Sequence, residues 1–165
     1  MKKLHLIRHA KSSWADDSLS DKQRPLNKRG QKSCGLMAKP ILNAGCKFEN
    51  VFCSSAVRTQ LTIDLISKNL PKHPFEWQLD DDLYTFDRDD LLAWCHKRDN
   101  SMQEVVIIGH NPALTDLCNY LSTSTVDNMP TCAYAQLSFE GEHWQDLAEG
   151  SMELMVLLKP KMLKS

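Results

Sequence analysis

LHLIRHA, at residues 4–10, is an apolar run that ends abruptly in Arg8 and His9. A short apolar run of this kind fits a buried strand, and open α/β sheets bind their ligands at the carboxyl ends of such strands. Arg8 and His9 would then stand at a ligand site. On the dipeptide alone, the better interpretation is a strand that simply meets solvent, so the rest of the chain has to decide.

The chain has 165 residues, the size of one ordinary domain, and we expect a single domain over residues 1–165. Its 20 Lys and Arg against 21 Asp and Glu give a formal net charge of −1, so no global field would attract nucleic acid or an anionic membrane. No stretch is apolar enough for a signal core or a membrane span. We therefore expect a soluble, cytoplasmic monomer with no nucleic-acid or membrane partner.

Six cysteines are scattered along the chain without the dense spacing of a secreted disulfide scaffold, which predicts buried free thiols. The common zinc, dinucleotide and nucleoside-triphosphate motifs are absent from the sequence. His5 and His9 could not share one ion, because four residues of strand separate them by roughly 13 Å. We therefore expect neither a metal nor a cofactor.

Two strand-and-helix pairs are predicted for the first half of the chain. Asn27 is a good helix cap and Gly45 a good stop, although Pro40 should kink this helix or end it early. Residues 51–53 form a short apolar run, and Ser54 or Ser55 is expected to cap the helix after it. Arg58 would lie in the first turn of that helix, beside its free backbone N–H groups. An arginine at a helix start favours an anion site. An ordinary surface arginine is an equally good interpretation of Arg58 when it is taken alone.

The second half of the chain repeats this alternation. Residues 105–108 are a continuous β-branched run that fits a fully buried parallel strand and leads into His110-Asn111-Pro112. Asn111 is expected to cap the next helix, with Pro112 as its first residue. The other expected elements are strands at 75–79, 132–139 and 152–158 and a helix opened by Asp87 or Asp89.

Functional side chains stand directly after three of the predicted strands. Arg8 and His9 end the first, Arg58 comes after the second, and His110 comes after the strand at 105–108. A parallel sheet would gather them along one edge. We predict an α/β fold, a three-layer α/β/α sandwich around a mostly parallel central sheet, with a phosphate site at the carboxyl ends of the strands.

The chemistry of this set fits a phosphoryl group. The guanidinium fork of arginine binds phosphate oxygens bidentately, and a helix start adds neutral donors. One of the histidines could be the nucleophile, since imidazole is substantially unprotonated near neutrality and attacks phosphorus without the help of a base.

Four motifs, in order and over most of the chain, resemble the histidine phosphatase (phosphoglycerate mutase-like) superfamily. They are Leu6-Ile7-Arg8-His9-Ala10, Arg24-Pro25-Leu26, Ser54-Ser55-Ala56-Val57-Arg58-Thr59 and Gly109-His110-Asn111-Pro112. The short length and the Arg-Pro-Leu segment are most similar to the small phosphohistidine phosphatases of the SixA type. Ala10 departs from the pattern, since many members have glycine there.

The resemblance implies a role for each site residue. His9 would accept the phosphoryl group and pass it to water without a metal, while Arg8, Arg58 and His110 would hold its equatorial oxygens. No glutamate stands out as the proton donor; Asp82 is the nearest match by position and Asp81 a weaker one. Further contacts to the substrate are expected from Arg24, Ser54 and Asn111.

The weak acid position favours P–N substrates. An alkyl phosphate needs its leaving oxygen protonated, whereas phosphohistidine can expel neutral imidazole. The short chain also leaves little length for a lid, so a histidine-phosphorylated protein could reach His9. The alternatives are a small-molecule phosphomonoester phosphatase of the same superfamily and a non-catalytic phosphoprotein-binding module. A mutase is a third option, but the chain is short for the closed site that it needs.

A cysteine phosphatase is a further alternative, because Cys53 precedes Arg58 in one loop. Those enzymes place five residues between the two, whereas this chain has four. Cys53 is better interpreted as the buried end of a strand.

Overall fold

Six strands form one sheet in the computed structural model, which describes residues 1–163. In chain order they are β1 (Lys2–Arg8), β2 (Val51–Ser54), β3 (Trp77–Asp80), β4 (Glu104–Gly109), β5 (Tyr134–Phe139) and β6 (Glu153–Leu158). Their order across the sheet is β3-β2-β4-β1-β5-β6. The first four strands run parallel, and β5 pairs antiparallel with both β1 and β6.

β1 and β4 are the two central strands of the sheet, and their apolar sequences account for its burial. β1 and β4 pair in register, so that Leu6 lies beside Ile107 and Arg8 beside Gly109. The apolar side chains of both strands are buried on both faces, as expected for parallel strands that are covered by helices on each side. The β-branched run in β4 therefore forms the middle of the molecule.

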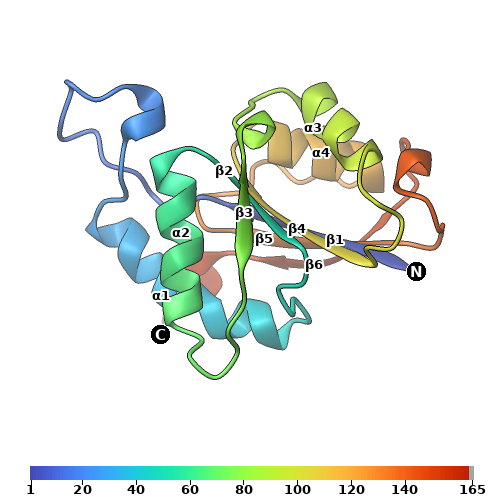
Figure 1. The fold of residues 1–165 in the computed structure, drawn as a ribbon, viewed down its shortest axis with the longest axis horizontal. Coiled ribbons are helices and arrows are strands. Elements are labelled where there is room, and N and C mark those ends of the chain that lie inside the picture. Colours follow the sequence, from blue (N-terminus) through green and yellow to red (C-terminus); the bar gives the residue numbers. More distant parts are fainter. Residues whose placement is uncertain (164–165) are drawn as a thin grey trace.

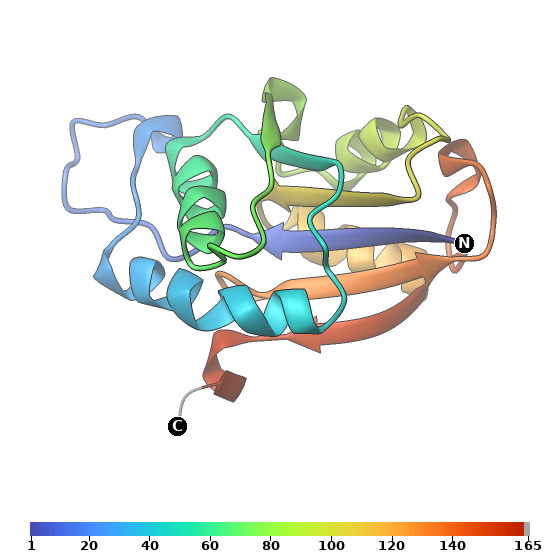
Figure 2. The ribbon, with the colours of Figure 1, turned by 60° about the horizontal axis from the view of Figure 1, so that its bottom comes forward.

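Helices cover both faces of the sheet (Figure 1). α1 (Lys28–Asn43) and α2 (Val57–Lys68) pack on one face, and α3 (Arg88–His96) and α4 (Ala113–Ser122) on the other. Figure 2 shows the first pair in front of the sheet and the second pair behind it. The predicted three-layer α/β/α sandwich around a mostly parallel sheet is confirmed.

Each face has its own apolar core, because side chains alternate across a strand. Leu6 points into the core beneath α3 and α4, which contains Trp94 and Leu117. Ile7 points into the other core, which contains Met37 and Ile63. The residues of both cores are buried, and the two layers of helices fix the strand ends between them.

The first helix begins as predicted and ends later. The Asn27 side chain accepts the Gly30 N–H at 2.8 Å, which confirms the cap. Pro40 does not end the helix, which continues to Asn43. Pro40 lies in the last turn of the helix. It removes one backbone hydrogen bond there, and only three helical residues follow it.

Two other helix starts differ from the prediction. Ala56 is the N-cap residue of α2, in place of Ser54 or Ser55, and no side chain caps this helix. α4 begins at Ala113, one residue later than expected, with Pro112 as its cap residue. The other predicted strands and helices are present with small shifts at their ends.

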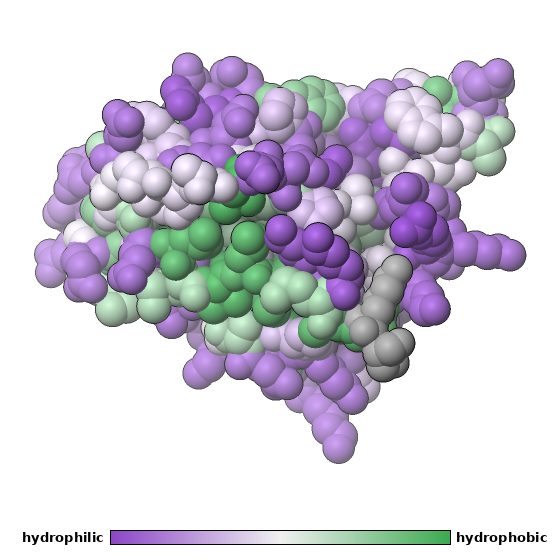
Figure 3. Space-filling view, turned by 180° about the vertical axis from the view of Figure 1, so that it is seen from behind, coloured by the Kyte–Doolittle hydropathy of each residue, from purple (hydrophilic) through white to green (hydrophobic). Residues whose placement is uncertain are grey.

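The outer side of the molecule is mostly polar. Figure 3 shows an apolar area that crosses this face. The edge strand β6 exposes Met155, and its neighbours Leu154 and Val156 are half-buried. Between residues 1 and 163, no helix combines the length and apolarity that a membrane crossing requires.

Candidate active site

The carboxyl ends of β1, β2 and β4 meet at one edge of the sheet, because these three strands are neighbours. His9 comes directly after β1, and its N–H donates to the Gly109 carbonyl at the end of β4. The rings of His9 and His110 lie 5.3 Å apart between centroids. The predicted convergence of both histidines is therefore present.

His9 is held in one orientation by the backbone. Its Nδ1 lies 2.7 Å from the Ala10 carbonyl oxygen, which can only accept, so Nδ1 carries the proton. The lone pair then belongs to Nε2, which makes no hydrogen bond within residues 1–163. Thr62 fixes the next residue, since its hydroxyl accepts the Ala10 N–H at 2.9 Å. This geometry suits Nε2 as a nucleophile.

The electrostatic surroundings keep His9 neutral. Burial lowers its pKa to about 4, against the opposing hydrogen bond to Ala10, and the charges of Arg58 and Arg8 lower it further. His9 is only 7% exposed. Above pH 5 the ring is therefore unprotonated and its Nε2 lone pair is available.

His110 is also neutral, and Ser54 determines which nitrogen bears its proton. The Ser54 hydroxyl accepts the Ala56 N–H at 3.3 Å and lies 2.7 Å from His110 Nε2. When this hydroxyl donates to Nε2, the ring proton of His110 is on Nδ1. Burial lowers the pKa of His110 to about 3, with the neighbouring His9 as the next cause. His110 thus offers one neutral N–H donor.

Arg8 is anchored by a loop between α4 and β5. Its Nη1 donates to the Met129 carbonyl at 2.9 Å. Asn111 holds that loop, since its side-chain amide donates to the same carbonyl at 2.9 Å while its Oδ1 accepts the Thr115 N–H. Burial, and then the charge of Arg58, lower the pKa of Arg8 from its ordinary value.

Asp21 links the two remaining arginines. Its carboxylate accepts from Arg58 Nη2 at 2.9 Å, from Arg24 Nη2 at 3.1 Å and from the Tyr84 hydroxyl at 2.6 Å. Partial burial opposes its ionisation, but the hydrogen bonds from Tyr84 and Arg58 prevail and lower the pKa of Asp21 to about 2. Arg58 itself is only 2% exposed. A phosphoryl group at this edge would share Arg58 with a permanent carboxylate.

Three nitrogens at this edge are buried without a hydrogen-bond partner in the described structure: Arg8 Nε, Arg58 Nε and His110 Nδ1. The Ser55 hydroxyl nearby is the fourth such atom. Leaving a buried donor unsatisfied costs about 1–3 kcal/mol. Such groups are rare in folded proteins, and their clustering here indicates a place that is built for an anion.

The structure places the other predicted site residues less directly. Ser54, Arg24 and Asn111 use their polar atoms on neighbouring protein groups, so they position other side chains. Asp82 lies on an exposed turn after β3, and no hydrogen bond joins its carboxylate to His9 or His110 in the described region.

Asp21 and Tyr84 were missed by the sequence analysis. No motif in the sequence marks either residue. Both reach Arg58 only through the folded chain, and Asp21 is 37 residues away from it in sequence. The one available signal was that Asp21 stands three residues before Arg24, the spacing of an ion pair in a helical turn.

The cysteine alternative does not fit the geometry. Cys53 is fully buried at the end of β2, its thiol donates to the Ser54 carbonyl, and burial raises its pKa to about 12. A thiol in this state is a poor nucleophile. The six cysteines are buried and unbridged, as predicted. Nowhere in residues 1–163 do three or more His, Cys, Asp or Glu side chains group as a metal site requires.

The chain is similar to known proteins in sequence and in fold. The model of the histidine phosphatase superfamily (branch 1) matches residues 4–91, which contain β1, the Arg24 segment and Arg58. An uncharacterized chloroplastic protein of Arabidopsis thaliana is 26% identical over 155 residues, which are 88% of this chain and 70% of that protein.

Two solved structures share the fold. The putative phosphohistidine phosphatase SixA from Nakamurella multipartitia has a TM-score of 0.81 at 24% identity, with 96% of each chain covered. A protein histidine phosphatase SixA in complex with tungstate has a TM-score of 0.80 at 22% identity and covers 98% of this chain and 99% of its own.

Proposed function

The chain belongs to the histidine phosphatase superfamily, and from this premise we propose that it is a phosphatase that acts on phosphohistidine in proteins through a phosphohistidine on His9. The three buried, unpartnered nitrogens of Arg8, Arg58 and His110 carry the proposal. A phosphoryl group bound between them would satisfy all three. Phosphate oxygens are the acceptors that such donors fit best.

The first step transfers the phosphoryl group to His9. The Nε2 lone pair forms a bond to phosphorus while the P–N bond of the substrate breaks, and the bonding pair returns to the substrate nitrogen. A phosphohistidine whose other ring nitrogen carries a proton leaves as neutral imidazole. Arg8, Arg58 and His110 would stabilise the charge on the equatorial oxygens.

The second step returns the enzyme to its starting state. Water attacks phosphorus, the P–N bond to His9 breaks, and its electron pair returns to Nε2. Inorganic phosphate leaves, and the proton lost by water goes to phosphate or solvent. Because His9 keeps its Nδ1 proton on the Ala10 carbonyl in both steps, it needs no proton transfer of its own. We propose that neither step requires a metal.

Asp82 has a narrower role in this proposal. The alcohol of a phosphate monoester leaves as an alkoxide unless its oxygen is protonated. Asp82 is the proposed proton donor for monoesters alone. We call Arg8, Arg58 and His110 the phosphoryl clamp. The exposed position of Asp82 suits contact with a bound leaving group better than a fixed place in this clamp.

The test compares hydrolysis of phosphoramidate and of a phosphohistidine peptide with hydrolysis of a panel of phosphate monoesters. We expect rapid hydrolysis of the P–N compounds and an acid-labile, base-stable phosphoenzyme. In His9→Ala, the phosphoenzyme should be absent and kcat should fall by about 10⁴-fold or more.

Other outcomes separate the alternatives. Efficient cleavage of monoesters with no hydrolysis of P–N compounds would indicate a small-molecule phosphatase. Tight binding of the phosphopeptide without turnover would indicate a binding module. Loss of activity in Cys53→Ser with retention in His9→Ala would overturn the assignment of the nucleophile.

A further inference from the structure

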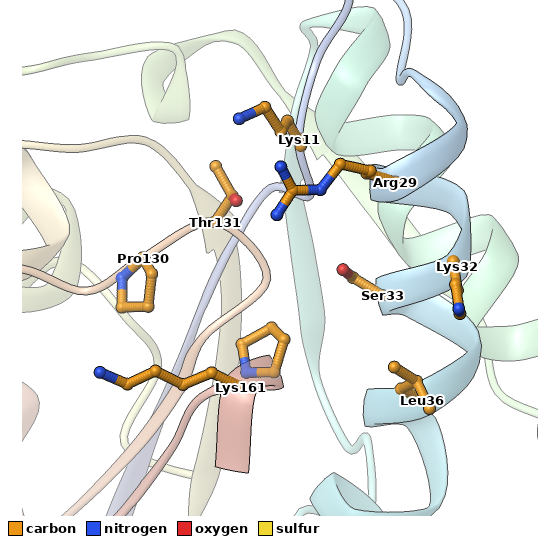
Figure 4. A pocket seen from close by; sticks show the side chains of 9 residues that line it. Lys11, Arg29, Lys32, Ser33, Leu36, Pro130, Thr131 and Lys161 are labelled. Carbon is orange, nitrogen blue, oxygen red and sulfur yellow. The ribbon is translucent and has the colours of Figure 1, made fainter. Parts of the chain in front are cut away.

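A basic cavity lies beside the proposed phosphoryl site. It has a volume of about 380 Å³ and is lined by four cationic and two hydroxyl side chains: Lys11, Arg29, Lys32, Lys161, Ser33 and Thr131. Figure 4 shows Arg29 and Ser33 reaching from α1 toward Thr131, with Lys11 above them. Of the described residues that line the cavity, none is acidic. Its charge is therefore far more positive than the near-neutral chain as a whole.

Within residues 1–163, the cations of this cavity form no ion pair. Among the ion pairs of residues 1–163, none includes Lys11, Arg29, Lys32 or Lys161. Elsewhere on the surface, basic side chains such as Lys68 and Arg88 pair with a nearby aspartate. The lack of carboxylates is thus local to the cavity.

The position of these charges is unfavourable for α1 itself. Arg29 and Lys32 lie in the first turns of the helix, which has no acidic residue in its first turn. Positive side chains are disfavoured at the positive end of the helix dipole, and like charges three residues apart repel one another. A bound anion would relieve both effects. Arg29 and Lys32 therefore lower the stability of α1 and favour binding of an anion.

Both walls of the cavity are tied to His9. Lys11 stands two residues after His9, and its carbonyl accepts the Asn27 N–H at 3.0 Å. A Cβ at Gly30 would overlap that same carbonyl, so α1 packs directly on the Lys11 backbone. On the other wall, Thr131 precedes Cys132, whose N–H donates to the His9 carbonyl at 3.0 Å. Backbone contacts therefore fix both walls of the cavity to the segment that carries His9.

We propose that this cavity binds a second anionic group of the substrate, a carboxylate or a phosphate close to the transferred phosphoryl group. The preferred substrates would then be phosphohistidines flanked by acidic or phosphorylated side chains. This inference rests on the proposed function and adds a substrate class to it. The cavity supplies charge and hydroxyl donors for the second group, and the clamp at His9 holds the first.

The experiment uses three phosphohistidine peptides of equal length whose flanking residues are neutral, aspartate or phosphoserine. For the wild-type protein, we expect a KM about fivefold lower for either anionic peptide, the size of one partly screened charge pair, with similar kcat. Arg29→Gln should remove most of this preference and leave the constants for the neutral peptide unchanged. Lys72→Gln, which removes a charge between α2 and β3 at the opposite edge of the sheet, should keep the preference.

The outcomes are distinct from those of the proposed function. A preference for the aspartate peptide assigns the second group as carboxylate, and one for the phosphoserine peptide assigns it as phosphate. Equal constants for all three peptides, or an equal loss on all three in Arg29→Gln, would overturn the inference. Phosphoramidate lacks a second group, so its hydrolysis tests the phosphatase alone. If it is not hydrolysed, calorimetric binding of the same peptides to His9→Ala and to Arg29→Gln still tests the cavity.

Discussion

Two groups of strand ends share one edge of the sheet and differ in how their polar atoms are satisfied. At the ends of β1, β2 and β4, Arg8, Arg58 and His110 keep buried nitrogens without a partner among the described residues. At the end of β3, the two Asp80 carboxylate oxygens accept the Asp82 N–H and the Trp94 indole N–H. The donors of the first group are unsatisfied among the described residues, whereas the Asp80 oxygens of the second group are satisfied by the protein itself.

Ligand binding is expected where buried donors have no partner in the protein. A carboxylate whose oxygens are already occupied stabilises the local turn and α3, as Asp80 does. Donors that remain unsatisfied in the protein interior cost stability and gain from a ligand. Substitutions in the clamp are therefore expected to change activity strongly. Substitutions in the acidic turn, Asp80 to Asp82, are expected to change it weakly.

The largest effect on turnover, after loss of the nucleophile, is expected for Arg58→Lys. Lysine keeps the charge but loses the fork and the Nε donor, and removal of one such donor typically lowers kcat by about 10²-fold. Measurement of kcat on phosphoramidate checks this. Arg88→Lys, on an arginine stacked against Tyr120, is the control and should be unaffected. Equal activity of both variants would mean that the clamp does not hold the phosphoryl group.

The second prediction concerns pH. The pKa of His9 is lowered from 6.5 to about 4 in the folded protein, so between these values the unfolded chain binds more protons than the folded one. His9 should therefore lower the free energy of unfolding by on the order of 3 kcal/mol on acidification from pH 6.5 toward pH 4, and His110, whose pKa is also lowered, should add to this fall. Urea unfolding between pH 4.5 and 7.5 measures this slope. His9→Gln should make this slope shallower without removing it, because His110 still contributes, and identical slopes would contradict the assigned burial of His9.

A smaller effect is expected for Ser54→Ala. Without the hydroxyl, neither ring nitrogen of His110 has a fixed proton, and loss of such a supporting hydrogen bond typically lowers activity by about tenfold. Nitrogen NMR of His110 should show a single tautomer in the wild type and a mixture in the variant. A fall in activity without a change of tautomer would limit Ser54 to packing.

The smallest effect is expected for Asp82→Asn. Hydrolysis of phosphohistidine should stay within about twofold, as for an ordinary exposed substitution, while hydrolysis of alkyl phosphates should fall. Asp81→Asn, on the adjacent exposed carboxylate, is the control. If phosphohistidine hydrolysis is lost in Asp82→Asn, the division between the two groups of strand ends is wrong.

Much of this edge could be predicted from the sequence, because the signal was local. Apolar runs that end in Arg8-His9 and in Gly109-His110 predict both the strands and the polar side chains at their carboxyl ends. A parallel sheet then requires the ends to meet, whatever the exact path of the chain between them. The sheet type and the meeting of both histidines could be inferred from these few residues.

The parts that were missed depend on contacts between distant segments. Tyr84 and Asp21 are 63 residues apart and are joined by a hydrogen bond to one carboxylate oxygen. The helix cap at Ala56 was missed for a related reason. A serine before a helix normally caps it, but the Ser54 hydroxyl contacts His110, 56 residues away, and the Ser55 hydroxyl has no partner among the described residues. Local preference gave way to a tertiary contact.

The Asp21 network also gives the protein an optical reporter. Arg24 holds the Asp21 carboxylate and stacks on Trp14, with 3.5 Å from the guanidinium carbon to the ring centroid. Trp14 is 75% exposed, whereas the other three tryptophans are buried or half-buried. An anion that competes with Asp21 for its arginines changes the charge beside this exposed indole. The emission of Trp14 should therefore track occupancy of the clamp in real time, without any label.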